Sequence, residues 1–171
     1  MMEKSDKLIY YKRLAKSISY GKSRDLKNID FIVVHFTANA NDTAKNNVDY
    51  FATGNQRSAG AHYFVGRDGV AESVPANFVP WSVGDKQAKL NGGGSKMKLC
   101  FNSNSVSVEL CDFRTWNDKV ATIAAEFITA IRHDLLIERK NIIRHYDVTG
   151  KLCPAPLVDE VMWNKFLNLI N

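Results

Sequence analysis

Residues 31–37 of the chain read FIVVHFT. This stretch is almost entirely apolar and rich in β-branched residues, which is typical of a strand buried on both faces of its sheet. Strands of this kind lie in sheets that helices cover on both sides. His35 stands at the end of this strand, so the same stretch also supplies the first candidate functional residue.

The segments that flank this strand alternate between helical and extended patterns. Directly after it, Asn41 or Asp42 can cap a helix that Gly54 ends. Residues 61–74 (AHYFVGRDGVAESV) contain an Arg-Asp-Gly turn between two short strands, which predicts a hairpin. Residues 105–111 (SVSVELC) return to the strict alternation of a strand.

The C-terminal part of the chain continues in the same way. Asp118 opens the most clearly amphipathic helix, residues 141–145 (NIIRH) form another short strand, and residues 157–170 predict a closing amphipathic helix. Strands that alternate with helices indicate an α/β fold with a central mixed β-sheet flanked by helices. We expect one domain at residues 29–171 and interpret residues 1–28 as an N-terminal extension that is partly helical.

The composition is that of a folded globular protein. The chain has 171 residues, of which 45% are hydrophobic and 24% charged, and this suits one domain. No apolar run approaches the ~20 residues of a membrane span. The N-terminal residues lack the apolar stretch of a secretory signal, so we expect synthesis in the cytoplasm. We also expect a monomer.

The net charge of +5 favours an anionic partner, such as nucleic acid or an anionic cell wall. Lysine and arginine are scattered along the chain, with no helix-turn-helix, zinc-knuckle spacing or basic stripe. We therefore expect no nucleic-acid partner.

The three cysteines are Cys100, Cys111 and Cys153. An odd number of cysteines in a chain without an export signal argues against a disulfide framework. Metal binding or plain burial is favoured over a Cys100–Cys111 bridge.

His35, His145 and Cys153 form a candidate zinc site. Each histidine ends a buried strand, and Cys153 follows in a loop that Gly150 and two prolines restrict. Neutral imidazole and thiolate are preferred zinc ligands, and three protein ligands with one open position mark a catalytic site. The alternative is two satisfied core histidines and a buried free thiol. His133, by contrast, lies on the polar face of its helix, where we expect it to be exposed.

Two charged residues near this set are candidate catalytic groups. Lys151 lies two residues before Cys153 and can point to the same side as the thiolate, where a cation stabilises a developing oxyanion. Glu109 interrupts the apolar residues of a strand that we expect near the centre of the sheet, and a buried carboxylate often has a pKa suited to proton transfer. Beside a zinc site, a glutamate is the usual general base. The alternative for Glu109 is a solvent-facing residue on a one-sided strand.

Several motifs together resemble a known family. The chain contains, in order, VVHFTAN, AHYFVGRDG, WSVGD, NSVSVELC and HYDVTGKLCPAP. These motifs resemble those of type 2 N-acetylmuramoyl-L-alanine amidases, a family that includes phage endolysin catalytic domains and the peptidoglycan-recognition proteins. The resemblance covers roughly residues 29–170 and implies a single domain with the fold of that family.

The resemblance also implies roles for individual residues. At the positions of His35, His145 and Cys153, family members bind one Zn²⁺ ion. A lysine at the position of Lys151 polarises the scissile carbonyl, and in the Gram-positive phage branch a glutamate at the position of Glu109 is the base. The family cleaves the amide between N-acetylmuramic acid and L-alanine of the stem peptide.

One position departs from the family pattern. Some members carry a catalytic tyrosine immediately before the residue that matches His62, and this chain has Ala61 there. Tyr63 points to the opposite side of its strand, so the departure favours Glu109 as the base. We expect His62, Trp81 and Asp85 to line the substrate cleft; the alternatives are packing of His62 in the sheet and of Trp81 in the core.

These observations predict a zinc-dependent peptidoglycan amidase. A phage or prophage endolysin, which acts on the cell wall after release, is the leading interpretation. The alternatives are a cytoplasmic amidase that recycles muropeptides and a peptidoglycan-binding module without catalysis. Modules of the last kind typically lack the cysteine ligand, which this chain retains.

Overall fold

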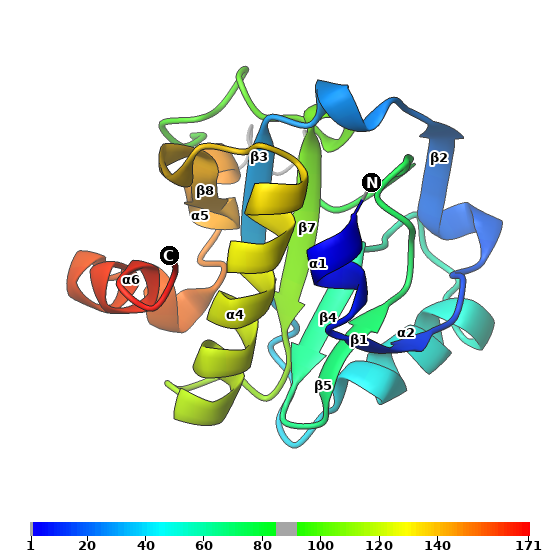
Figure 1. Cartoon of the computed structure of the whole chain (residues 1–171), viewed down its shortest axis with the longest axis horizontal. Coiled ribbons are helices and arrows are strands. Elements are labelled where there is room, and N and C mark those ends of the chain that lie inside the picture. Colours follow the sequence, from blue (N-terminus) through cyan, green and yellow to red (C-terminus); the bar gives the residue numbers. More distant parts are fainter. Residues whose placement is uncertain (1, 85–91) are drawn as a thin grey trace.

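The computed structural model describes residues 2–84 and 92–171. A six-stranded sheet forms its centre (Figure 1). The strands in spatial order are β1 (Ile9–Lys12), β5 (Gly69–Glu72), β4 (Tyr63–Gly66), β7 (Ser105–Leu110), β3 (Phe31–Phe36) and β8 (Ile142–Arg144). Among these six strands, only β4 and β5 pair antiparallel, through the predicted hairpin. The other neighbours in this sheet are parallel, so the predicted mixed sheet is confirmed.

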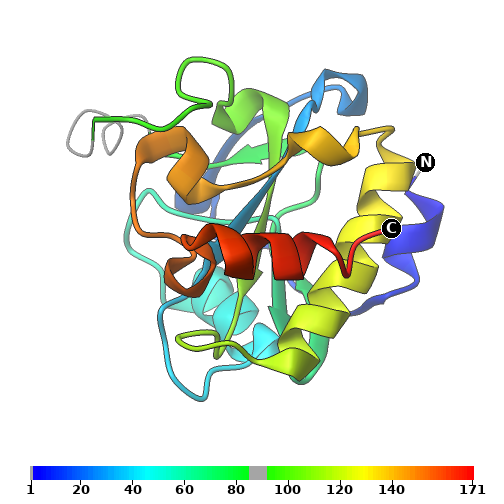
Figure 2. The same cartoon turned by 90° about the vertical axis from the view of Figure 1, so that its left-hand side faces the viewer.

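Helices cover both faces of the sheet. On one face lie α4 (Asp118–Asp134), α1 (Glu3–Asp6) and α6 (Glu160–Leu167), and α2 (Ala44–Thr53) packs on β4 and β5 from the other face. Figure 2 shows α6 beside α4. The remaining elements are α5 (His145–Thr149), the pair β2 (Tyr20–Ser23) and β6 (Phe78–Pro80), and 3-10 turns at Ser17–Ser19, Leu26–Asn28, Asn102–Asn104, Arg139–Asn141 and Ala155–Leu157. Within the described ranges, no helix combines the length and apolarity that crossing a membrane requires.

The main core lies between α4 and the sheet. Strand residues alternate between faces, so Ile32 and Val34 of β3 meet the α4 side while Val33 belongs to a cluster on the other side. On α4, residues at helical spacing such as Phe127 and Ile131 are completely buried. The predicted helix therefore presents the expected face to the core, and Asn117 caps it by accepting a bond from the N–H of Val120.

Two helix boundaries differ from expectation. Helix α2 is capped by Thr43, whose hydroxyl accepts a bond from the N–H of Asn46 at 3.1 Å, and not by Asn41 or Asp42. The Asp42 carboxylate instead accepts a hydrogen bond from the backbone N–H of Asp112, in the turn after β7, at 2.5 Å. The closing helix, predicted at residues 157–170, spans only Glu160–Leu167. Residues Ala155–Leu157 form a separate 3-10 turn before it.

The first 28 residues contribute strands to the same sheets. β1 extends the edge of the main sheet beside β5, and β2 pairs with β6. The short helix α1 is tied to α4, since Asp134 accepts bonds from the N–H and the hydroxyl of Ser5 at 2.8 and 2.7 Å. A domain boundary at residue 28 stays a prediction, although these contacts join the segment closely to the rest of the fold.

We expect Phe127→Ala to lower the free energy of unfolding by about 3–5 kcal/mol, as is usual for a large aromatic side chain removed from a core. Phe127 is fully buried and packs edge-on against Tyr63, with ring centroids 4.8 Å apart. On the exposed face of the same helix, His133→Ala should change that free energy by at most about 0.5 kcal/mol. Urea denaturation measures both, and equal losses would contradict this assignment of the α4 faces.

Candidate functional site

The site lies on the sheet face opposite α4. In β7, Val106, Val108 and Leu110 point into the α4 core, so Glu109 points away from it. β3 and β7 pair parallel with His35 directly beside Glu109. Side chains of register partners on neighbouring strands share a face. The pairing therefore places an imidazole and a carboxylate together at the end of two buried strands.

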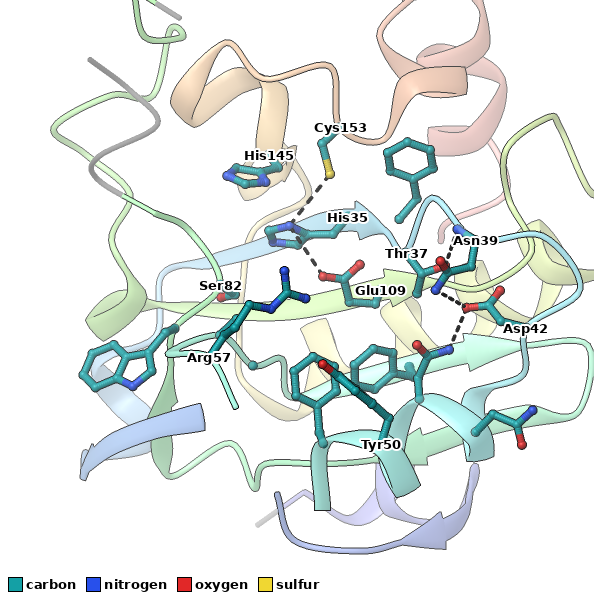
Figure 3. Close-up of a pocket in the computed structure, with 18 of the residues that line it drawn as sticks. His35, Thr37, Asn39, Asp42, Tyr50, Arg57, Ser82, Glu109, His145 and Cys153 are labelled. Carbon is teal, nitrogen blue, oxygen red and sulfur yellow. Dashed lines mark hydrogen bonds and ion pairs between the residues drawn. The ribbon is translucent and has the colours of Figure 1, made fainter. Parts of the chain in front are cut away.

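Three candidate metal ligands meet at this point (Figure 3). His145 follows β8, the other neighbour of β3, and Cys153 comes from the loop after α5. The candidate donor atoms of His35, His145 and Cys153 lie within 4.8 Å of one another. The Cys153 Sγ is 4.0 Å from Nδ1 of His35, and the two imidazole centroids are 4.5 Å apart. Donor atoms in a tetrahedral zinc site are separated by roughly 3.5 Å, so only a small contraction is needed.

Three ring nitrogens of this cluster are buried without a hydrogen-bond partner in the described part of the chain. Among the described residues, none bonds Nε2 of His35 or either ring nitrogen of His145. An unbonded buried polar group costs about 1–3 kcal/mol, and a metal ion would satisfy these nitrogens. Burial and neighbouring positive charge lower the pKa of His145 to about 4 and keep that of His35 well below its usual value. Both imidazoles are therefore neutral, which is the form that binds metal.

Glu109 borders the cluster. Its Oε1 is 4.0 Å from Nδ1 of His35, and its side chain is 19% exposed. Burial raises the pKa of Glu109 to about 7; the nearby Lys151 opposes this rise and Asp42 adds to it. A carboxyl group that titrates near neutral pH can both accept and return a proton. Its position and its pKa therefore suit a general base.

A cleft of about 800 Å³ opens in front of these residues. Its lining comes from the end of β3, from α2, from residues 57–60 and from the loops that carry Trp81 and Lys151. Figure 3 shows the Arg57 side chain extending into the cleft toward Glu109. The residues of the lining that the sequence did not single out as part of the site include Thr37, Asn39, Asp42, Asn47, Tyr50, Arg57 and Ser82. On α2, helical spacing could have indicated Tyr50, since it is exposed and lies off the face that carries Ala44 and Val48.

A buried asparagine shapes the segment that carries Arg57. Asn55 is fully buried, and its amide group donates to the hydroxyl of Ser19 and to the carbonyls of Arg57 and Ala59 at 2.8–2.9 Å. Its carbonyl accepts from the N–H of Arg57 at 3.1 Å. These bonds fix the backbone at Arg57, so the cation is presented to the cleft by an ordered turn.

The predicted substrate residues lie in different places. Trp81 lines the cleft and is 41% exposed, and the predicted catalytic residue Lys151 also lines it. His62 is not in the cleft lining and has no exposed surface. This differs from the position that we favoured and matches the alternative of packing in the sheet. Asp85 lies outside the described residues.

The burial of His62 has a clear cause. Its Nδ1 is 3.0 Å from the hydroxyl of Ser107, and its Nε2 is 2.8 Å from the guanidinium of Arg24. The backbone N–H of Ser107 also donates to Nδ1 at 3.0 Å, and the carbonyl of Phe78 lies 3.2 Å from Nε2. Burial and then the charge of Arg24 keep the pKa of His62 well below its usual value. The ring is thus satisfied inside the fold.

The other two cysteines lie away from the cluster. Cys100 and Cys111 are buried free thiols that belong to separate hydrophobic clusters. Neither belongs to the group of possible metal ligands found among the described residues. Burial is therefore the role that the structure shows for both.

Comparison with known proteins identifies the family. The sequence model that describes the N-acetylmuramoyl-L-alanine amidase family matches residues 25–156 of the chain. The chain belongs to this family. The resemblance drawn from the sequence motifs is thereby confirmed.

Individual relatives agree with this assignment. The N-acetylmuramoyl-L-alanine amidase CwlL of Bacillus licheniformis is 33% identical over 141 residues, which are 79% of this chain and 38% of that protein. The endolysin of Listeria phage A511 is 34% identical over 83 residues, which are 48% of this chain and 24% of that protein. The chain thus spans less than half the length of these curated relatives. The structure of PlyL matches with a TM-score of 0.77 at 22% identity, over 94% of this chain and 96% of that one, and it supports the fold.

Proposed function

We propose that this protein is a zinc-dependent hydrolase of peptidoglycan that cleaves the amide between N-acetylmuramic acid and L-alanine. The observation that carries the proposal is the cluster of His35, His145 and Cys153 at the floor of a large cleft, beside a carboxylate. Membership of the amidase family supports the reaction. The named relatives, an amidase and a phage endolysin, support a role in degrading the cell wall.

His35, His145 and Cys153 would hold the ion. Two neutral imidazoles and one thiolate form a donor set that zinc prefers, and three protein ligands leave one position open to the cleft. Burial and the charge of Glu109 raise the pKa of the Cys153 thiol to about 12, so metal binding would release its proton. When bound, such an ion supplies Lewis-acid catalysis.

Glu109 would transfer the proton during the reaction, and Lys151 would stabilise the negative charge that develops on the substrate. The Glu109 carboxylate accepts a proton from the attacking water as the water oxygen bonds to the scissile carbonyl carbon. As the carbon–nitrogen bond breaks, the same group returns the proton to the leaving nitrogen of L-alanine. The Lys151 ammonium group stabilises the negative charge that develops on the carbonyl oxygen.

The cleft walls would bind the substrate. Trp81 offers an exposed aromatic surface on which a sugar ring can stack, and Arg57 offers a cation to an anionic group of the stem peptide. Asp85 remains a predicted substrate residue. His62 is not part of this proposal, because its ring nitrogens face Arg24 and Ser107 inside the fold.

A phage or prophage endolysin is the setting that we favour. The relative from Listeria phage A511 carries that name. A non-catalytic binding module is disfavoured, because Cys153 lies within the metal cluster together with both histidines. Comparing intact cell wall with a soluble muropeptide as substrate would separate an endolysin from a recycling amidase.

We expect the purified protein to contain about one zinc ion per chain. Cys153→Ser should lose most of this metal, because a hydroxyl is a much poorer zinc ligand than a thiolate. Cys100→Ser is the matched control, since it makes the same exchange at a buried cysteine outside the cluster. Elemental analysis measures the metal content of all three proteins. Equal zinc in both variants would rule out Cys153 as a ligand.

We expect Glu109→Gln to slow hydrolysis by roughly 10²–10⁴-fold, the usual share of general-base catalysis. The amide keeps the shape of the side chain but cannot take up the proton. The assay is the release of new L-alanine amino termini from purified cell wall, measured with zinc content and melting temperature. Glu138→Gln, at an exposed ion pair with Lys140, is the control and should stay active.

Two outcomes would contradict this account. A Glu109→Gln protein that is folded, zinc-loaded and fully active would exclude Glu109 as the base. A wild-type protein that contains zinc but releases no new amino termini from cell wall would contradict the proposed reaction itself.

A further inference from the structure

Arg144 is a buried cation beside the candidate metal site. It is the last residue of β8, directly before His145, and is 5% exposed. A guanidinium group has five N–H donors in a rigid planar fork. Nε bonds Asp147, Nη1 bonds the carbonyls of Leu157 and Val158 at 3.0 and 3.1 Å, and Nη2 bonds Asp147 and Glu160 at 2.7 Å each. Every donor therefore has an acceptor.

These acceptors lie at the two ends of one segment. Asp147 follows His145 by two residues, whereas Leu157 and Val158 follow Cys153 by four and five. The guanidinium thus bridges the start and the end of residues 145–158, which carry two of the three candidate ligands and Lys151. Inside the bridge, the N–H of Tyr146 donates to the carbonyl of Cys153 at 2.8 Å.

Packing holds the bridge in one orientation. The guanidinium carbon lies 5.3 Å from the ring centroids of both Tyr146 and Trp163. The Asp147 carboxylate also accepts from the backbone N–H of Arg144 at 2.7 Å, and its side chain is only 14% exposed. A lysine could supply the charge at this place but not the planar set of five donors.

We propose that Arg144 is a positioning residue that sets the separation of His145 and Cys153 before a metal ion binds. This inference rests on the metal site of the proposed function. In the absence of the bridge, the ion would have to order residues 145–158 when it binds, and that ordering would weaken its affinity. With the bridge, residues 145–158 are ordered when the chain folds, so ordering them does not weaken metal binding.

The alternative is that Arg144 only stabilises the fold. Glu160 provides a control that separates the two roles. It accepts from the same Nη2 at the same 2.7 Å as Asp147, but it belongs to α6, outside residues 145–158, and its side chain is 68% exposed. Removing the charge of Glu160 changes the surroundings of Arg144 while the bridge across the ligand segment remains.

The test compares Arg144→Lys, Asp147→Asn and Glu160→Gln in the full-length protein. Zn²⁺ affinity is measured by competition with a chromophoric chelator, at a temperature where circular dichroism shows each metal-free protein to be folded. Co²⁺ binding is followed through the thiolate-to-cobalt absorption band, which reports on Cys153 independently of activity. Melting temperatures of the metal-free proteins are recorded alongside.

We expect Arg144→Lys to weaken Zn²⁺ binding by about 10- to 100-fold, the range seen for groups that orient metal ligands. Its thiolate-to-cobalt band should be altered or weakened. Asp147→Asn should act in the same direction, and it decides the question if the lysine variant does not fold. Glu160→Gln should bind Zn²⁺ within about fivefold of wild type, as expected for an exposed ion pair.

Two results would overturn the inference. If Arg144→Lys or, failing that, Asp147→Asn binds Zn²⁺ and Co²⁺ like wild type, then Arg144 is only structural, whatever the change in melting temperature. If the wild-type protein itself binds no Zn²⁺, the proposed metal site fails together with the inference. The wild-type measurement thus distinguishes the two failures.

Discussion

The parallel pairing of β3 with β7 on one side and β8 on the other is the constraint on which the site depends. It sets His35 beside Glu109 in register and brings the start of α5 next to the same strand. A slip of one residue in β3 would turn His35 into the α4 core and Val34 into the cleft. The apolar residues on the α4 side fix the register, so the same packing that stabilises the sheet also positions the chemistry.

The buried polar groups of the site destabilise the fold locally. Two neutral imidazoles with unbonded nitrogens and a mostly buried carboxylate occupy one face of the sheet. The large apolar core on the opposite face stabilises the strands that carry them. Features that destabilise a protein locally are typical of functional sites. Metal binding would relieve the cost at the imidazoles, and the buried Arg144 holds the ligand segment in place.

The sequence predicted those features that depend on periodicity and residue type. The apolar strand, the hairpin and the long helix follow from local patterns. The three candidate ligands follow from donor chemistry at two strand ends and in the loop after the second strand. Periodicity could not assign His62, because its partner Arg24 is 38 residues away in the chain. It also could not reveal Arg57, because the turn that presents it is held by Asn55, which itself bonds the hydroxyl of Ser19, 36 residues away in the chain. Contacts between distant segments decide such positions, and one sequence does not encode them in any local pattern.

We propose that two histidines and one cysteine form a single zinc site. X-ray absorption at the zinc edge of the loaded wild-type protein tests it most directly. We expect one sulfur ligand at about 2.3 Å and two imidazole nitrogens at about 2.0 Å, with the remaining coordination from a light atom. A zinc shell without sulfur, or one with several sulfurs, would contradict the proposal.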